Sequence, residues 1–339
     1  MILVTGGTGF LGSHVLLELI RKGYSVRATY RTPDHKEHTR RIFGYYQSGE
    51  DLYSNIEWIS CDIEDYFSVY NAIGDCSVVY HAAGFVSFND KDKYRLNRLN
   101  TLGTANVVNA CLAHEIKCLC YVSSIAALGE IAPGVTISES VIWNHGKKAS
   151  AYSSSKFHGE MEVWRGISEG LSAVIVNPSV ITGPGMWFGP GRNLWNSIKK
   201  GLKYYTEGST GYVDVSDVAR LMIWLVENEK YGERYIINSD HLNNKELLTL
   251  LSDGFGKPAP AKKVTPLIAR IALFAESVRA LVTGSEKRIS RRMLKTAKAS
   301  LNYSNDKIVS LTGYQFLPLE SSIRRSVEAF KSELQLNEK

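Results

Sequence analysis

The sequence predicts an α/β fold, in which a doubly wound parallel sheet is followed by a smaller, mainly helical C-terminal domain. Short apolar runs alternate with stretches of helical period through the first 180 residues. Continuous apolar strands separated by helices are typical of parallel sheets that are covered on both faces. After Pro178 this alternation stops, and Gly-Pro-Gly triplets at 183–185 and 189–191 indicate a loop-rich segment.

Six apolar runs are predicted to be strands, at residues 2–4, 25–29, 56–59, 78–81, 119–122 and 174–176. Three longer stretches between them have helical period, at residues 11–21, 104–114 and 154–169. A helix start near 214–220 and a strand at 235–237 return to the sheet, and mostly short helices follow from about 240. We therefore expect a nucleotide-binding domain over 1–178, rejoined by 212–239, and a substrate-binding domain over 179–211 and 240–339.

The overall charge is mildly basic. Forty Lys and Arg against 34 Asp and Glu give a net charge of +6, and the 44% hydrophobic content is that of an ordinary globular protein. This excess falls short of the dense basic stripe of a nucleic-acid-binding protein, although it suits an anionic cofactor or substrate. We therefore expect no nucleic-acid partner.

The five cysteines form no C-x-x-C pair, and none lies near a histidine at metal-ligand spacing. They are therefore expected to be free thiols in a reducing compartment, and no metal is expected. The chain enters a strand at residue 2, and its longest apolar stretch, 266–282, contains Arg270, Glu276 and Arg279. The sequence thus predicts a cytoplasmic protein without an integral membrane segment.

A glycine-rich loop follows the first predicted strand. The stretch ILVTGGTGFLGSHVLLELI places Gly6, Gly9 and Gly12 between a strand and a helix, and the same turn contains Phe10 and Leu11. Such glycines allow a tight turn, close approach of the backbone to a pyrophosphate, and close helix–strand packing. The free N–H groups at the helix start favour phosphate. A Gly-rich turn alone is weak evidence, but this context predicts a dinucleotide site in a Rossmann-type fold.

The end of the second predicted strand indicates which dinucleotide binds. A cofactor with a free ribose 2′-hydroxyl usually meets Asp or Glu there, but this strand reads VRATYRTP and carries Arg31 instead, with Lys36 and Arg40 shortly after. A guanidinium can pair with a 2′-phosphate; the alternative is a solvated, basic helix start. NADP(H) is therefore preferred, with NAD(H) as the alternative cofactor.

The stretch YSSSK spaces Tyr152 and Lys156 four residues apart, so a helix would place both on one face. This pattern arises roughly once by chance in such a chain, and the serine run alone would suit a flexible hinge. A phenol, with a free pKa of about 10, protonates a carbonyl oxygen only if that pKa is brought toward the working pH. A neighbouring ammonium does so by stabilising the phenolate, so the pair is a candidate for acid–base catalysis.

Several motifs occur in the order found in the extended short-chain dehydrogenase/reductases, the epimerase/dehydratase superfamily, and the chain resembles that family over most of its length. The motifs are TGGTGFLG, CDIED, VYHAAG, NTLGTANV, YVSSIAALG, YSSSK, VNPSVITGPG and VDVSDVAR. VRATYRTP resembles the dihydroflavonol-4-reductase-like branch more than the sugar-nucleotide epimerases, which typically carry an acid there. The resemblance implies an NADPH-dependent reductase of a ketone or aldehyde, reversible as an alcohol dehydrogenase. The alternatives are an NAD-dependent nucleotide-sugar epimerase or dehydratase, and a non-catalytic NADP-binding sensor.

The resemblance also implies catalytic roles for particular residues. Ser124, with Ser123 as the fallback, would donate a hydrogen bond to the carbonyl oxygen, and Tyr152 would be the general acid or base. Lys156 would stabilise the phenolate and hold the nicotinamide ribose. Asn100 resembles the asparagine of a proton-relay network, and its alternative is a buried, hydrogen-bonded amide.

For the cofactor, the resemblance implies that Asp62 hydrogen-bonds the adenine with Ile63 beside the ring. The alternative for Asp62 is a helix N-cap, because a helical stretch follows it. Small residues after the fourth strand would leave room for the ribose and phosphates, and Pro178 would lie against the nicotinamide; the small residues are Ala82, Ala83 and Gly84. His81, just before them, is expected to be a packed strand residue.

The substrate is a small carbonyl or alcohol compound that the sequence does not name. Plant dihydroflavonol reductases carry an asparagine where this chain has Gly129, which argues against a flavonoid. An aromatic set would suit an apolar pocket, although such sets more often pack a core: Trp187, Phe188, Trp195, Tyr204 and Tyr205. Arg192 would meet an anionic group or be solvated. The basic segment 286–300 is expected to be a solvated helix face, with a membrane surface or carrier as the alternative, and a homodimer is expected from the resemblance alone.

Overall fold

A seven-stranded parallel sheet forms the centre of the computed structural model, which describes residues 1–87, 89–129, 134–143, 149–188, 192–283, 294 and 297–337. Its strand order is β11-β7-β5-β4-β1-β2-β3, and the order reverses between β1 and β4, where open sheets of this kind bind ligands. The strands are β1 (Ile2–Thr5), β2 (Val26–Tyr30), β3 (Ile56–Ser60), β4 (Val78–His81), β5 (Cys118–Val122), β7 (Ala173–Pro178) and β11 (Glu233–Ile237). The predicted strands and the predicted fold class are confirmed.

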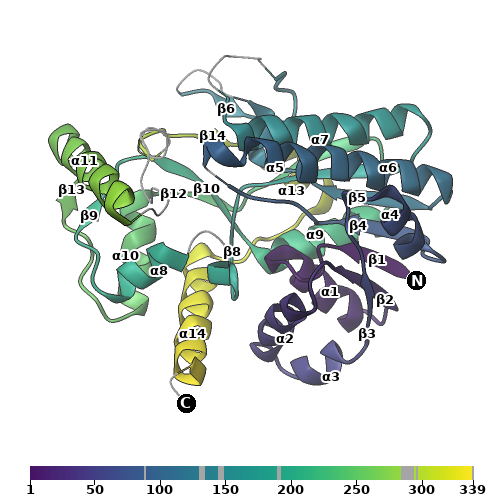
Figure 1. Cartoon of the computed structure of the whole chain (residues 1–339), viewed down its shortest axis with the longest axis horizontal. Coiled ribbons are helices and arrows are strands. Elements are labelled where there is room, and N and C mark those ends of the chain that lie inside the picture. The colour runs from purple at the N-terminus through teal and green to yellow at the C-terminus, as the bar shows by residue number, and fades with distance from the viewer. Residues whose placement is uncertain are drawn as a thin grey trace.

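Helices cover both faces of this sheet (Figure 1). On one face α1 (Phe10–Arg21) packs beside α9 (Val215–Glu227), and on the other α6 (Gly103–Ala113) lies between α4 (Tyr66–Ile73) and α7 (Ala151–Ser168). Leu3 and Val4 are both fully buried but belong to the cores on opposite faces, as the two-residue period of a strand requires. The short helices α2 (Lys36–Gly44), α3 (Gly49–Tyr53) and α5 (Lys93–Asn97) complete this part of the described chain.

Most of the remaining elements form a smaller, mainly helical part (Figure 1). Its helices are α8 (Arg192–Lys199), α10 (Asn244–Gly254), α11 (Pro266–Thr283) and α14 (Leu319–Asn337), and its strands are β8 (Val180–Thr182), β9 (Tyr204–Tyr205), β10 (Ser209–Asp214), β12 (Asp240–Asn243) and β13 (Lys262–Lys263). Helix α13 (Asp306–Thr312) and the paired strands β6 (Thr136–Ile137) and β14 (Asn302–Tyr303) pack beside the large sheet instead. Helices α11 and α14 are longer than the short helices predicted here.

An aromatic core holds the smaller part together. Trp187 and Trp195 are each 1% exposed, and both rings contact Phe330 of α14. The core-packing alternative is therefore correct for these two tryptophans. Tyr204 is exposed, whereas Tyr205 is half-buried against the same core.

Three sequence expectations concern contacts with membranes or with anionic groups. Within the ranges given above, no helix is long and apolar enough to cross a membrane. The basic segment predicted at 286–300 falls mostly outside the described residues, since 284–293, 295 and 296 are not among them. The Arg192 side chain is likewise not described.

Candidate functional site

The glycine loop between β1 and α1 requires its glycines. Gly6 has a positive φ of 69° and packs so closely that an added Cβ would lie 2.6 Å from Ala83 Cα. An added Cβ on Gly12 would lie 2.1 Å from Gly6 O. The Gly9 N–H donates to Gly6 O at 2.9 Å, which closes the turn. The backbone can therefore adopt this tight path only with glycine at positions 6 and 12.

Hydroxyl groups from other elements hold the same loop. Ser13 Oγ donates to Gly9 O at 2.7 Å, Thr39 Oγ1 donates to Gly7 O at 3.0 Å, and Thr29 Oγ1 accepts from Gly6 N at 3.2 Å. Phe10 and Leu11 begin α1, the first half-buried and the second 9% exposed. The loop is therefore fixed before any ligand arrives.

Basic side chains follow β2. Arg31 is exposed and, among the described residues, has no hydrogen bond or ion pair. Lys36 differs, since its Nζ lies 4.5 Å from the centroid of the Tyr30 ring, and Arg40 pairs with Glu50 at 2.6 Å. Of the three predicted cations, Arg40 alone is held in an ion pair within the described chain, which leaves the charges of Arg31 and Lys36 for a ligand.

Asp62 and Ile63 follow β3. Asp62 is exposed, and its Oδ1 accepts from Glu64 N at 3.0 Å, whereas Ile63 is 8% exposed. Asp65, not Asp62, caps α4, because its carboxylate accepts from Phe67 N at 3.0 Å. The N-cap alternative for Asp62 is therefore wrong.

The end of β4 is built from a buried polar chain. His81 is fully buried and bonds Thr5 Oγ1 through Nδ1 at 2.6 Å and Thr104 Oγ1 through Nε2 at 3.1 Å. Burial lowers the His81 pKa to about 3, and the Lys156 charge contributes to this. His81 is thus a neutral, packed strand residue, as expected. Ala82 and Ala83 beyond it are half-buried.

Ser124 and Tyr152 meet at the end of β5. Ser124 Oγ accepts from Ala126 N at 3.1 Å at the start of a short 3₁₀ turn. Ser124 also lies beside Tyr152, from the first turn of α7, close enough for its hydroxyl to act on the Tyr152 pKa. Burial raises the pKa of Tyr152, and the Ser124 hydroxyl opposes that rise.

Lys156 lies one helical turn after Tyr152 and is 6% exposed. Its Nζ donates to Val122 O at 2.9 Å and lies 5.5 Å from the centroid of the Tyr121 ring. Burial lowers the Lys156 pKa to about 8, although the nearby Glu160 carboxylate favours the charged form. The ammonium is therefore held by a backbone carbonyl instead of a carboxylate.

Asn100 ties the catalytic helix to the loop after β4. Its Oδ1 accepts from Phe85 N at 2.7 Å, while Nδ2 donates to Phe85 O and to Ser155 Oγ, each at 2.9 Å. Asn100 is 1% exposed, so it is the buried, hydrogen-bonded amide that the sequence allowed as its alternative role. Ser155, from the serine run, thus faces the interior.

The residues present fit a nicotinamide dinucleotide. Gly84 is exposed, and a Cβ added there would lie 3.3 Å from Asn100 Oδ1 and 3.4 Å from Lys156 Nζ, so glycine keeps that space open. An ammonium has three N–H donors, and within the described chain Lys156 has one hydrogen-bond acceptor, Val122 O. Pro178 ends β7, buried and paired with Ile237.

Two side chains in this region were not predicted from the sequence. Asn177 Nδ2 donates to Ser124 O at 3.0 Å and to Glu160 Oε2 at 2.9 Å. Glu160 follows Lys156 by four residues, so the same helical spacing that pairs Tyr152 with Lys156 was a usable signal. Asn177 could not be found this way, since it comes from a different strand.

Comparisons with known proteins agree with this arrangement. The family model described as "NAD dependent epimerase/dehydratase family" matches residues 2–238. A putative dihydroflavonol 4-reductase from Synechocystis sp. is 26% identical over 337 residues, covering 97% of this chain and 94% of the relative. Cinnamoyl-CoA reductase 1 from Oryza sativa subsp. japonica is 30% identical over 275 residues, covering 77% and 78% of the two chains.

A solved structure extends the likeness to nearly the whole fold. The crystal structure of gox2253 matches with a TM-score of 0.79 at 27% identity and covers 98% of both chains. The matched family region contains the glycine loop, Ser124, Tyr152 and Lys156. The chain therefore belongs to the NAD-dependent epimerase/dehydratase family of extended short-chain dehydrogenase/reductases, and it is an NAD(P)-dependent oxidoreductase.

Proposed function

We propose that the protein is an NADPH-dependent reductase of a ketone or aldehyde, reversible as an alcohol dehydrogenase, with Tyr152 as the general acid. The observation that carries this proposal is the placement of Ser124 beside Tyr152, with the buried Lys156 ammonium one turn further along α7. When bound, the nicotinamide supplies hydride chemistry that protein side chains lack. The chain's own residues must then supply a proton and orient the carbonyl.

Tyr152 would give that proton. In the protein without cofactor, burial raises the pKa of Tyr152, contrary to the lowering expected from Lys156, so the hydroxyl keeps its proton at neutral pH but gives it up less readily. The phenolate that remains needs a nearby positive charge. Lys156 provides it, since its ammonium is on the same helix face and its depressed pKa of about 8 still leaves it mostly charged at pH 7.

Ser124 and Asn100 complete the proposed arrangement. Ser124 Oγ would donate to the same carbonyl oxygen that receives the Tyr152 proton, which fixes the carbonyl against the phenol. Asn100 holds Ser155 of the catalytic helix by its amide, so its expected contribution is to the position of α7 and to the proton-relay network. Both roles are consistent with hydrogen bonds that the serine and asparagine already make.

The cofactor would lie along the carboxyl ends of the strands. We assign the pyrophosphate to the Gly6–Gly12 loop, the adenine to Asp62 and Ile63, the ribose and phosphates to the small residues 82–84, and the nicotinamide to Pro178. The free charge of Arg31 supports a 2′-phosphate, with Lys36 in reserve. We further assign the substrate to the part formed by 179–211 and 240–339, with 1–178 and 212–239 as the cofactor domain.

The small-molecule substrate is proposed to be a carbonyl compound other than a flavonoid. Gly129 has a positive φ of 90°, so the asparagine that plant dihydroflavonol reductases carry would be strained at this position. The relatives named as a cinnamoyl-CoA reductase and a putative dihydroflavonol reductase support carbonyl reduction. The family name supports the alternative, an NAD-dependent nucleotide-sugar epimerase or dehydratase, but β2 has no acid at its end.

Replacing Arg31 by Ala tests the cofactor assignment. We expect the wild type to bind NADPH more tightly than NADH. Arg31→Ala should weaken NADPH binding about tenfold, because a charge-assisted hydrogen bond to phosphate is lost, and should leave NADH binding unchanged. Fluorescence titration with each cofactor measures both constants. Arg40→Ala is the matched control, since Arg40 is already paired with Glu50.

A wild-type preference for NADH, or NAD that co-purifies with the protein, would contradict the reductase assignment and favour the epimerase. Equal losses of NADPH and NADH affinity in Arg31→Ala would contradict the 2′-phosphate role alone. Oxidation of NADPH in the presence of a panel of aldehydes and ketones then identifies the substrate class.

A further inference from the structure

Glu160 is a buried carboxylate for which the proposed mechanism gives no role. It lies on α7, four residues after Lys156, and is 2% exposed. A buried carboxylate is costly unless its charge is balanced and its oxygens are hydrogen-bonded. Both oxygens of Glu160 are fully engaged, and the two sets of partners lead to different parts of the site.

One oxygen reaches the end of β5. Glu160 Oε2 accepts from Ser123 Oγ at 2.6 Å and from Asn177 Nδ2 at 2.9 Å. The same Asn177 amide donates to Ser124 O at 3.0 Å. Two adjacent residues of the strand end are thus bonded to one carboxylate of the catalytic helix, Ser123 directly and Ser124 through Asn177.

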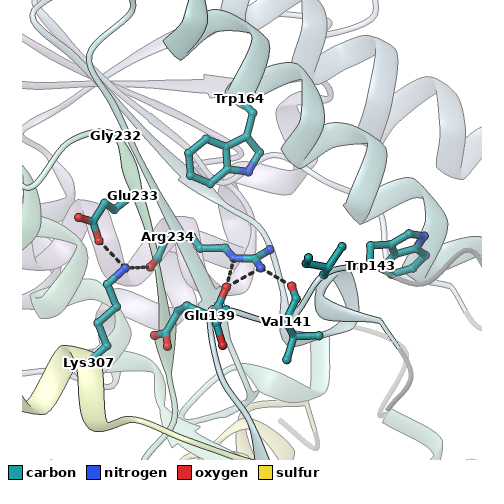
Figure 2. Close-up of a pocket in the computed structure, with 10 residues that line it drawn as sticks. Glu139, Val141, Trp143, Trp164, Gly232, Glu233, Arg234 and Lys307 are labelled. Carbon is teal, nitrogen blue, oxygen red and sulfur yellow. Dashed lines mark hydrogen bonds and ion pairs between the residues drawn. The ribbon is translucent and has the colours of Figure 1, made fainter.

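The other oxygen reaches β11. Glu160 Oε1 accepts from Arg234 Nη1 at 3.1 Å and from Trp164 Nε1 at 3.3 Å. Arg234 also donates to Glu139 O and Val141 O, as Figure 2 shows beside a hollow of about 480 Å³. Its guanidinium thereby links the carboxylate to the segment that precedes α7.

We propose that Glu160 is a positioning residue that holds Ser124 in register with Tyr152 and Lys156. It joins the strand end that carries the serine to the helix that carries the tyrosine and lysine. The effect of Glu160 on catalysis rests on the proposed function. The hydrogen bonds that join Glu160 to the end of β5 do not depend on it.

The Glu160 carboxylate also raises the pKa of the nearby Lys156 ammonium. Within the described chain, the titratable groups that act on or contact Lys156 are Glu160 on its own helix, His81 on β4 and Tyr121 on β5, and the four-residue spacing puts Tyr152 on the same helix face. Of these only Glu160 has a carboxylate, and Arg234 pairs with that carboxylate at 3.1 Å. Removing the Glu160 charge should therefore lower the Lys156 pKa, and removing the Arg234 charge should raise it.

The test is to titrate Lys156 in the cofactor-free protein. With lysine labelled by ¹³C at Cε, NMR follows each ammonium, and Lys156→Met assigns the signal. Glu160→Gln should lower the Lys156 pKa by about one pH unit, as expected for loss of a neighbouring opposite charge. Glu162→Gln is the matched control, because it removes the same charge from α7 at a residue paired with Arg165, and it should leave the titration unchanged.

Catalysis gives the second readout. In Glu160→Gln, kcat should fall about tenfold or more, as expected for a displaced catalytic group, and its alkaline limb should move to lower pH. An unchanged Lys156 titration together with a wild-type pH profile would overturn the proposal. If Glu160→Gln does not fold, Arg234→Gln replaces it and should raise the Lys156 pKa; an unchanged or lower value there would overturn the proposal equally.

The two proposals fail in different ways. If the wild type reduces no aldehyde or ketone with NADPH, the proposed function is wrong, but the Lys156 titration still tests the link to Glu160. If the wild type is an active reductase and Glu160→Gln behaves as Glu162→Gln does, the proposed function stands and the role of Glu160 is wrong.

Discussion

At the scale of single residues, the site depends on charges placed where water is excluded. Lys156 is 6% exposed and its nearest acceptor is a neutral carbonyl, so burial depresses its pKa to about 8. Burial also shifts the pKa of Tyr152, but upward, because the charged form of a phenol is the deprotonated one. The sequence indicated this pair by its spacing and by the family resemblance, whereas the bond from Lys156 to Val122 O joins two chain segments that no local pattern connects.

Tyr152→Phe separates binding from chemistry. The phenyl ring fills the same space, so NADPH affinity should stay within about twofold of the wild type, while kcat should fall by about a hundredfold or more because the proton donor is lost. Cofactor titration and steady-state kinetics on one preparation measure the two effects. Turnover that survives in Tyr152→Phe would mean that another group donates the proton.

At the scale of elements, the catalytic helix begins earlier than its apolar period suggests. Helical period predicts a start at 154, but α7 begins at Ala151 because Ser150 caps it, its Oγ accepting from Ser153 N at 2.9 Å. The serine run is therefore helical, and the hinge alternative is wrong. Small polar residues carry little periodic signal, so a cap is the only local clue to this boundary.

Removing this cap should affect both stability and catalysis. Ser150→Ala should reduce the free energy of unfolding by about 1 kcal/mol and should also lower kcat, since Tyr152 lies in the first turn. Asn243→Ala is the matched control, because Asn243 caps α10 in the same way, accepting from Glu246 N at 2.9 Å. It should lose similar stability and keep wild-type kcat. Urea unfolding and kinetics measure both quantities, and equal kcat losses in the two variants would contradict a local role for the cap.

At the scale of the whole molecule, the sequence predicts which segments form the sheet but not what lies beside what. The six predicted strands and the return of 235–237 are found in the sheet, because continuous apolar runs identify buried strands from local information. Long-range polar links escape such patterns. Glu333 of α14, for example, accepts from Arg41 Nη1 at 2.7 Å and from Tyr45 Oη at 2.8 Å on and beside α2.

Two buried histidines predict how the whole molecule responds to acid. Burial lowers the pKa of His14 to about 4 and that of His81 to about 3. In the unfolded chain both would titrate near 6.5, so between these values the unfolded state binds protons that the folded state does not. Stability is therefore fully present above pH 6.5 and is lost as the pH falls toward 4 and 3.

Calorimetric unfolding at pH 5 in buffers of different ionisation enthalpy measures this proton uptake directly. At pH 5, unfolding should bind about two protons to these two histidines. The free energy of unfolding should therefore fall by about 2.7 kcal/mol for each unit by which the pH is lowered, since each proton contributes about 1.36 kcal/mol. His38 and His241, whose pKa values are also lowered by burial, add to the uptake, while the raised pKa of buried Asp217 subtracts from it. At pH 7.5 the histidine contribution should vanish. Uptake at pH 5 that stays the same when His81 is replaced by Gln would mean that His81 is charged in the folded protein, which its bonds to two threonine hydroxyls in a buried strand make costly.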